Sequence, residues 1–279
     1  MLCTVRPSGL LSSSRFPMTV SGPPSGGAAS AFERIFAMYS DRGLTKPKDR
    51  PHAISGLERR LTDLYKTEST FGIVRCCLGR TLLWQRCGEE RMKKIDDPSV
   101  EMIPSWSWMK FEGKIHYGHV PGVHTSWNRD ITLTSIGGPS LNGQKQCVLA
   151  VPSVRSLQGC HIEPRLDTNC EIRDREGRLV GWIKFDRKDE VDLGRLGCIV
   201  IAQHKAHGWA ESGQDTWKRF VDISCEESLK LSNLSFVLVV TRLAREQGYE
   251  VDVCHRLGVA VIQGECLSPG EPSETVWVI

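Results

Sequence analysis

Histidine and cysteine side chains are the first candidates for chemistry in this sequence, because imidazole and thiolate groups are the usual zinc ligands in proteins. His116 and His119 are three residues apart, and Cys160 is followed directly by His161. Residues three apart share a face of a helix but point to opposite faces of a strand. Both sets occur in sequence typical of strands or turns, which favours core or solvent-facing histidines. A metal-dependent hydrolase that uses His116 and His119, or Cys160 and His161, is the alternative hypothesis.

Signatures of nucleophilic catalysis are lacking in the sequence. It contains no G-x-S-x-G nucleophile elbow and no glycine-rich phosphate loop. Cys76 and Cys77 lie beside the apolar stripe of a predicted helix, which favours a core role over a reactive thiol. We therefore expect no catalytic residue, no cofactor and no bound metal.

A short basic loop at residues 42–50 provides a second alternative, a weak nucleic-acid binder that uses Arg42, Lys46, Lys48 and Arg50. A net charge of +3 is too small to indicate a nucleic-acid or membrane partner. The longest apolar runs are far shorter than the roughly 20 residues that span a bilayer. We expect an exposed loop, no membrane association and no nucleic acid.

The cysteines indicate a reducing compartment. There are eleven, none in a C-x-x-C pair, and a chain of this length does not need a disulfide framework to fold. Buried reduced thiols are the simpler interpretation, and the predicted location is the cytoplasm.

Three helices are predicted in residues 30–86. Two S-x-x-E capping boxes, at Ser30 and Ser55, mark the starts of the first two helices. The third helix runs from about Thr70 to Trp84, with apolar residues at helical spacing. Together the three helices are predicted to form a small helical segment.

Residues 102–279 have the pattern of short strands. The predicted strands are 113–120, 130–135, 146–151, 178–185, 196–203, 235–242, 249–262 and 274–279. A hairpin with a turn at Gly177 is the clearest of these signals. The predicted fold class is α+β: a short N-terminal helical segment followed by a β-rich, antiparallel sandwich or barrel-like region.

The remaining segments are predicted to be connections. Residues 1–29 are rich in Ser, Pro and Gly; they are interpreted as disordered, with a targeting segment or an artefact of a misplaced start codon as alternatives. Residues 87–101 are interpreted as a charged linker. The domain organisation is thus 1–29, 30–86, 87–101 and 102–279.

The stretch IPSWSWMKFEGKIHY, at 103–117, places Trp106 and Trp108 two residues apart. On a strand these side chains share one face, so we predict a structural anchor that docks the first strand after the linker. A surface platform for stacking a base or a sugar is the alternative.

Several blocks of the sequence resemble the region that follows the HET domain in fungal heterokaryon incompatibility proteins. YSDRGLTKPKDRPHAISGL is similar to that region's YS-x-R-x-LT…D-x-x-x-AISG, and FGIVRCCLGRTLLW to its AGLW…L…LLW. Residues 104–117 match PSWSWAS-x-x-G-x-I-x-Y. Later, GWIKFD is similar to a G…FD stretch and CHRLGVAVI to a yxRxGxxxI strand. The resemblance covers about residues 31–279.

The resemblance carries over a set of structural motif residues. They are Tyr39, Ser40, Arg42, Leu44, Thr45, Gly72, Leu83, Trp84, Pro104, Ser105, Trp106, Ser107, Trp108 and Gly113. Val74 departs from the pattern, which has tryptophan there, and Ile103 replaces a common alanine. None of the HET domain's own blocks is found.

The resemblance implies a role in fungal non-self recognition and in the cell death that follows fusion of incompatible hyphae. The expected function is a HET-family protein lacking a recognisable HET domain, acting as a non-catalytic accessory or interaction module. Other incompatibility proteins or full-length HET-family relatives are the implied partners.

Overall fold

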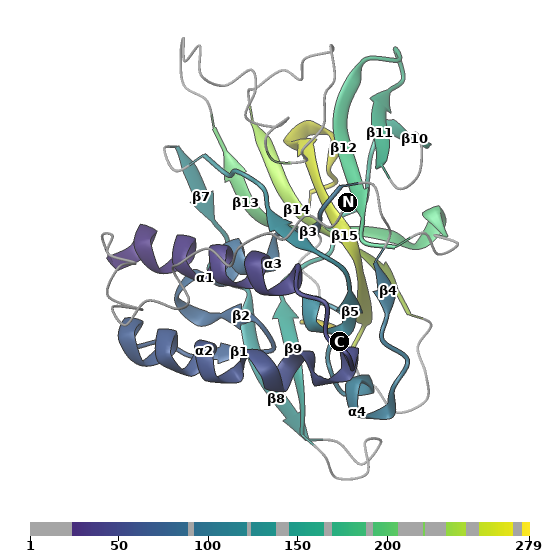
Figure 1. The fold of residues 1–279 in the computed structure, drawn as a ribbon. Helices are drawn as coiled ribbons and strands as arrows, with labels where there is room; N and C mark the ends of the chain where they lie inside the picture. The colour runs from purple at the N-terminus through teal and green to yellow at the C-terminus, as the bar shows by residue number, and fades with distance from the viewer. Residues whose placement is uncertain are drawn as a thin grey trace, which may run out of the picture.

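The α+β fold class is confirmed. In a computed structural model of the chain, helices lie at the N-terminus and most strands belong to one large mixed sheet (Figure 1). The residues that the structure describes are 24–88, 92–121, 124–137, 145–164, 169–187, 192–205, 220, 233–243, 251–269 and 275–279. The expectations for residues 1–23 lie outside this part of the chain.

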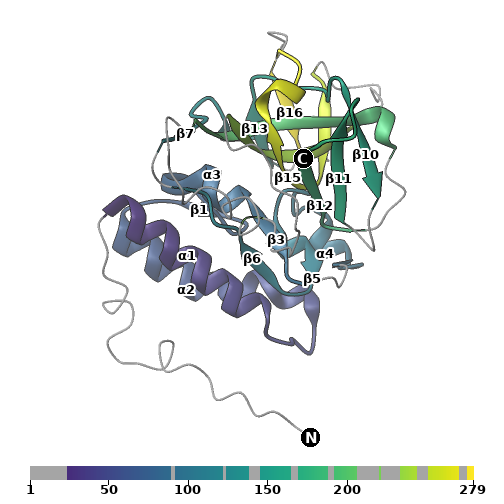
Figure 2. The same ribbon diagram turned by 90° about the horizontal axis from the view of Figure 1, so that it is seen from above.

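Two long helices, α1 (Pro24–Ser40) and α2 (Arg50–Tyr65), lie side by side (Figures 1 and 2). Both begin earlier than predicted, so the two capping-box starts are wrong. Ser30 lies inside α1, and the Ser55 hydroxyl donates to the carbonyl of His52, 2.7 Å away, within α2. A proline in the first turn, which lacks the N–H that a helix start leaves unpaired, suits the observed start of α2.

The predicted helix over 70–84 is wrong, because the chain reverses at its start. Phe71 and Gly72 have φ angles of 49° and 77°, which no right-handed helix contains. A Cβ at residue 72 would lie 2.2 Å from Nε1 of Trp108, so only glycine fits. The elements here are β1 (Ser69–Thr70), β2 (Ile73–Val74), a 3-10 turn (Arg75–Cys77), α3 (Leu78–Leu82) and β3 (Trp84–Arg86).

The cysteines on that turn differ in their surroundings. Cys76 is exposed, which corrects its predicted place in the core, and Cys77 is half-buried. Burial and the neighbouring Cys76 thiol raise the pKa of the Cys77 thiol. A raised pKa disfavours the nucleophilic thiolate.

The stretch expected to be a charged linker has structure of its own. It contains β4 (Lys93–Lys94) and α4 (Pro98–Glu101). The side chain of Asp97 caps α4 by accepting from the Ser99 amide at 3.0 Å. Met92, Ile95 and Val100 are buried, so the apolar residues between the charges attach this segment to the core.

The large sheet contains most of the predicted strands. Its strand bounds are β7 (Thr125–Trp127), β8 (Thr132–Gly137), β9 (Lys145–Val151), β10 (Cys160–Pro164), β11 (Asn169–Asp174), β12 (Leu179–Phe185), β13 (Leu196–His204), β14 (Leu234–Arg242), β15 (Val253–Gln263) and β16 (Val276–Val278). The order along the main path is β10-β11-β12-β15-β14-β13-β7. The predicted hairpin is β11–β12. The prediction of a wholly antiparallel sheet is wrong in one place: β16 pairs in parallel with the start of β15.

The central strands are buried on both faces. In β14, Phe236 and Leu238 belong to the core shared with the helices, whereas Val237 and Val239 belong to a second core on the other face of the sheet. This explains why β14 is a continuous apolar run instead of an alternating one. The first core also contains Phe36 of α1, so helices and sheet pack into the same cluster.

The two tryptophans of the PSWSW stretch do not lie on a strand. Trp106 is in a turn and Trp108 begins a 3-10 helix (Trp108–Lys110), which precedes β5 (Phe111–Glu112) and β6 (Ile115–Tyr117). The Ser107 hydroxyl oxygen accepts from the Met109 amide, 3.1 Å away, and so caps this helix. Local capping by serine therefore replaces the predicted strand.

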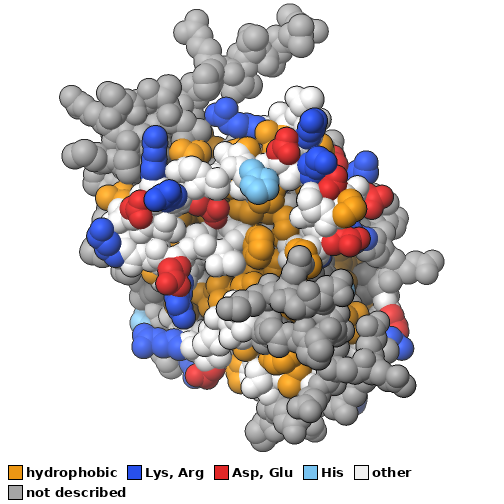
Figure 3. All heavy atoms as spheres, turned by 90° about the horizontal axis from the view of Figure 1, so that it is seen from below, with side chains coloured by type: hydrophobic (Ala, Val, Ile, Leu, Met, Phe, Trp, Pro, Cys, Tyr) orange, Lys and Arg blue, Asp and Glu red, His pale blue; other side chains and the backbone are white. Residues whose placement is uncertain are grey.

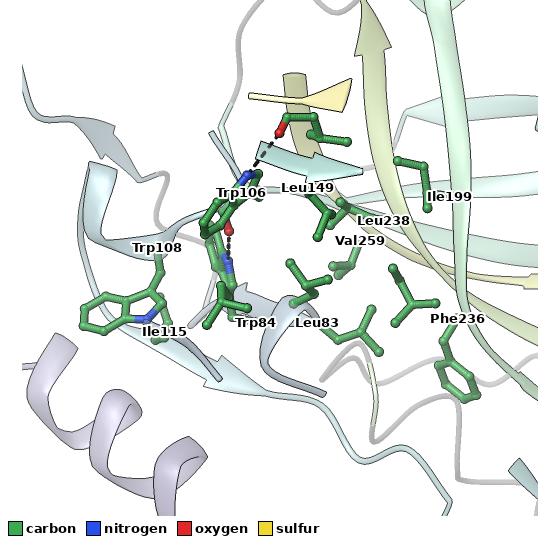
Figure 4. Close-up of a cluster of buried hydrophobic side chains, with 14 of the residues drawn as sticks. Leu83, Trp84, Trp106, Trp108, Ile115, Leu149, Ile199, Phe236, Leu238 and Val259 are labelled. Atoms are coloured by element: carbon green, nitrogen blue, oxygen red, sulfur yellow. Dashed lines mark hydrogen bonds between the residues drawn. The ribbon is translucent and has the colours of Figure 1, made fainter. Parts of the chain in front are cut away.

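Both indoles are completely buried, with 0% exposure. The Trp106 Nε1 donates to the carbonyl of Val278 at 3.1 Å, and the Trp84 Nε1 donates to the carbonyl of Trp106 at 2.8 Å (Figure 4). Trp108 packs against Phe36 of α1, with 5.5 Å between ring centroids. The indoles thus join helices and sheet, and their burial excludes a surface stacking platform.

Replacing either Trp106 or Trp108 by alanine should lower the free energy of unfolding by about 3–5 kcal/mol, because each change leaves a large cavity in a shared core. Chemical denaturation followed by circular dichroism measures this. As a control, Leu193→Ala at a side chain that is 50% exposed should change stability by less than about 0.5 kcal/mol. An unchanged unfolding midpoint in the tryptophan variants would contradict the packing described.

Candidate functional site

A buried ion pair joins the two late blocks of the resemblance. Asp186, at the end of GWIKFD, accepts from Nε and Nη2 of Arg256, in CHRLGVAVI, at 2.7 and 3.2 Å. The Arg256 side chain has 0% exposure and that of Asp186 4%. The guanidinium also donates to the carbonyls of Leu82 and Trp84 at 2.6 and 2.5 Å, and its carbon lies 3.5 Å from the Trp84 ring centroid. Almost every donor is used, so this arginine is a structural group.

The same junction includes the PSWSW turn. The backbone N–H of Arg256 donates to the Ser105 hydroxyl at 3.0 Å. Ser105 in turn donates, through its amide and its hydroxyl, to the carbonyl of Ile279. Segments about 150 residues apart in sequence therefore meet at Arg256.

A second buried arginine connects the first block of the resemblance to this region. Arg50 donates to the carbonyls of Phe111, Ser40 and Gly113 at 2.5, 2.8 and 3.0 Å. Its guanidinium carbon lies 5.3 Å from the centroid of the Trp108 ring. Burial lowers the pKa of Arg50. The guanidinium of Arg50 is occupied by protein carbonyls. Arg50 is therefore not available to bind nucleic acid, as the alternative hypothesis requires.

The other cations of the 42–50 loop lie on the surface and differ in their contacts. Lys48 pairs with Asp97 at 3.1 Å, and Arg42 and Lys46 are exposed. On the face drawn in Figure 3, Lys and Arg side chains are interspersed with Asp and Glu around a band of hydrophobic side chains. The side chains coloured on that face therefore do not form the continuous basic stripe of a nucleic-acid site.

The structure separates the motif residues into two groups. Arg42 and Thr45 are exposed, and Leu44 is half-buried against the core. The others that have described contacts lie around the two arginines and the indoles: Tyr39, Ser40, Gly72, Trp84, Ser105, Trp106, Ser107, Trp108 and Gly113. Leu83 is buried in the same core, and Pro104 is buried in the turn between Ile103 and Ser105.

The candidate metal ligands are not brought together. His116, on β6, has its Nε2 3.3 Å from the Nζ of buried Lys184, and His119 is exposed beyond the end of that strand. Cys160 and His161 are adjacent on β10, so they point to opposite faces. The Cys160 thiol shares a hydrogen bond with the free thiol of Cys266, and His161 pairs with Glu163 at 3.0 Å. Within the described residues no three His, Cys, Asp or Glu side chains are placed to hold one metal ion.

A cavity of about 280 Å³ lies next to the Arg256 junction. The cavity lies between the short strands β4 and β5 on one side and the ends of β12, β14 and β15 on the other. Its walls are Lys94, Ser105, Lys110, Phe111, Asp186, Arg187, Thr241, His255, Arg256 and Leu257. The β4–β5 ladder places Lys94 opposite Phe111, and the β14–β15 ladder places Thr241 opposite His255.

Cations outnumber anions among the described residues that line the cavity. Lys94, Lys110 and Arg187 contribute three cations, while the charge of Asp186 is matched by Arg256. Desolvation and then the neighbouring Lys94 lower the pKa of Lys110 to about 8. Desolvation, Lys110 and Lys94 lower the pKa of His255 to about 4, which leaves its imidazole neutral at pH 7. Clustered cations of this kind attract an anion.

Comparison of the chain with protein-family models, with curated proteins and with solved structures finds no match in any of the three. Among the described residues, no helix combines the length and apolar character needed to cross a membrane.

The cavity residues were not found by sequence reasoning. Lys94 lies in the predicted charged linker, and no sequence pattern marks Lys110, Arg187 or His255. One signal was available: Arg256 lies in the otherwise largely apolar strand CHRLGVAVI, and Asp186 directly follows the strand GWIKF, so a buried charge here would need a partner. Pairing them would have brought β12 and β15 together.

Replacing Asp186 by asparagine should lower the free energy of unfolding by about 3–5 kcal/mol, because it leaves the buried Arg256 without its counter-charge. The matched control is Asp41→Asn, which breaks an exposed pair with Lys114 and should cost at most about 1 kcal/mol. Equilibrium denaturation in urea compares them. Equal losses in the two variants would show that the buried pair has no special role.

The pKa of His255 predicts that the stability of the folded protein depends on pH. Its folded value of about 4 lies below the ordinary 6.5, so between these values the unfolded chain binds a proton that the folded chain does not. Stability is therefore fully present above pH 6.5 and decreases as the pH falls toward 4. The variant His255→Gln should lose less stability over that range, as measured by urea denaturation at a series of pH values. Parallel curves for both proteins would contradict the shift.

Proposed function

We propose that this chain is a non-catalytic interaction module of the heterokaryon incompatibility type, acting in the cytoplasm in fungal non-self recognition and incompatibility cell death. In this proposal it corresponds to the region that follows a HET domain, and its partners are other incompatibility proteins or full-length HET-family relatives. Its role is to bind and regulate, and the death activity belongs to the HET domain.

One observation carries the proposal. The blocks on which the resemblance rests, spread over residues 39 to 262, meet at one buried junction built on Arg256 and Arg50. Chance similarity in short blocks gives no reason for Asp186 to pair with Arg256, or for Trp84 to bond to Trp106. Their convergence supports interpreting the blocks as one inherited packing unit.

The hydrolase alternative is not favoured by the geometry. A catalytic zinc site needs about three protein ligands around one open position. His116 faces a lysine ammonium instead of a third ligand, and His161 is turned away from Cys160. The proposal is therefore a binding role.

The test expresses the chain in a fungal strain that carries a full-length HET-domain relative. After contact with an incompatible strain, a vital dye counts the dead fusion cells. We expect the dead fraction to fall severalfold, because a module without the effector domain competes for the contacts of the full-length protein.

Two variants serve as matched controls. Gly56→Ala changes an exposed helix position with nothing within 4 Å, so it should act like the wild type. Trp106→Ala combined with Trp108→Ala removes the junction and should have no effect on cell death. An unchanged dead fraction with folded wild-type protein present would refute the proposal, as would stoichiometric zinc in the purified chain together with hydrolase activity lost in His116→Ala.

A further inference from the structure

We infer that Cys160 and Cys266 form an oxidation site: a peroxide converts the two thiols into a reversible disulfide, which fastens the strap, residues 154–160, to the turn that follows β15. This inference goes beyond the proposed function and does not depend on it. It concerns two thiols of this chain, whereas the proposed function concerns a protein partner.

The strap lies against the second hydrophobic core, the cluster that contains Cys198 and Cys266. Arg155 pairs with Cys198 of β13 through two backbone hydrogen bonds of 2.8 Å each. The Gln158 amide donates to the carbonyl of Cys266 at 2.8 Å. The end of the strap is therefore fixed beside Cys266 before any covalent bond forms.

The two thiols are brought together at this end. Gly159, whose φ of 66° suits a residue without a Cβ, turns the strap into β10, which begins at Cys160. The Cys160 sulfur accepts a hydrogen bond that the Cys266 thiol donates. Cys160 is half-buried and Cys266 is buried, so an oxidant in solution reaches Cys160 more readily.

The surroundings give the two thiols different roles. The hydrogen bond from Cys266 lowers the pKa of the Cys160 thiol, against the opposing effects of burial, Cys198 and Asp174. The same hydrogen bond, followed by burial, raises the pKa of the Cys266 thiol. Because the thiolate is the nucleophile, Cys160 reacts first with the peroxide, and Cys266 is the thiol that then forms the disulfide.

Hydrogen peroxide alone supplies the oxidising equivalents. The Cys160 thiolate attacks one peroxide oxygen: an S–O bond forms, the O–O bond breaks, and the departing hydroxide takes up the proton that Cys160 lost. The Cys266 sulfur then attacks the Cys160 sulfur, so that the S–S bond forms and the S–O bond breaks. The second hydroxide leaves with the Cys266 proton as water. One peroxide is thus reduced to two water molecules while two thiols are oxidised to one disulfide.

A reducing compartment makes this disulfide a transient one. A small thiol such as glutathione attacks one sulfur of the disulfide and regenerates both cysteines by thiol–disulfide exchange. The expectation of reduced cysteines and the proposed site are therefore compatible. The reduced form is the resting state, and the disulfide forms when peroxide is present.

A second pair of neighbouring thiols, Cys76 and Cys77, is less suited to a disulfide. The Cα atoms of adjacent residues lie about 3.8 Å apart, which is less than the roughly 4.4–6.8 Å that disulfides usually span. Cys160 and Cys266 belong to different elements that are far apart in sequence. Their disulfide would close a long loop, the case in which a cross-link restricts the unfolded chain most.

The experiment treats the reduced full chain with hydrogen peroxide, alkylates the remaining thiols and maps the peptides by mass spectrometry without reduction. We expect a Cys160–Cys266 disulfide that glutathione removes. Cys266→Ser leaves the oxidised Cys160 without its partner, so labelling of Cys160 by dimedone, which traps sulfenic acid, should rise at least about tenfold. The matched control is Cys147→Ser, which removes another half-buried thiol, one whose pKa is raised by burial. It should leave the yield of the disulfide unchanged.

Thermal unfolding gives a second readout. Oxidised wild-type protein should melt at least about 5 °C above the reduced protein, because the cross-link fastens the strap and restricts the unfolded chain. Oxidised Cys147→Ser should show the same rise, and Cys160→Ser and Cys266→Ser should show none. Each variant is compared with its own reduced form, so a loss of stability from the substitution itself does not affect the result.

Three results would overturn the inference. The absence of a disulfide, or a Cys160–Cys198 product in its place, would exclude this pair. Equal melting of oxidised and reduced wild-type protein would exclude the fastening of the strap. Loss of the disulfide in Cys147→Ser would show that the oxidation is not specific to this site. None of these results bears on the cell-death test of the proposed function.

Discussion

The guanidinium of Arg256 is the group around which the structure is arranged. A buried cation is tolerated only when a counter-charge and further hydrogen bonds replace the water that it loses. Here the counter-charge comes from the end of β12, two carbonyls come from the α3–β3 segment, and Trp84 covers the flat face. Moving the end of β12 away would leave an unpaired charge in the core, and moving the α3–β3 segment away would leave guanidinium donors without acceptors. The same elements also pack into one hydrophobic cluster.

The protein uses its cations in two different ways. Arg50, Arg86 and Arg256 are buried, and each bonds to backbone carbonyls of segments distant in sequence. Their planar, multidentate donors suit this cross-linking role. Lys94 and Lys110, by contrast, line a cavity, and the Lys110 ammonium donates to the carbonyl of Glu101, 3.4 Å away. The buried arginines therefore join several segments at once, whereas Lys110 bonds to one nearby carbonyl.

The strands could be predicted from the sequence because their signals are local. Alternation around Gly177 and the apolar run of β14 place β11, β12 and β14 nearly where they are observed. The predicted starts of the first two helices were wrong because α1 begins at Pro24, before Ser30, and α2 begins at Arg50, before Ser55. Capping boxes are weak signals against tertiary packing. The fold class was therefore predictable, and the element ends were not.

The cavity could not be predicted, because its walls come from segments whose meeting depends on Arg256. No spacing rule relates Lys94 and Lys110 to Arg187 or His255. Within the PSWSW block, Lys110 also stands where the pattern of the resemblance has serine. Blocks of sequence that mark a packing junction need not mark the charged residues beside it, because the groups of the junction are engaged with one another.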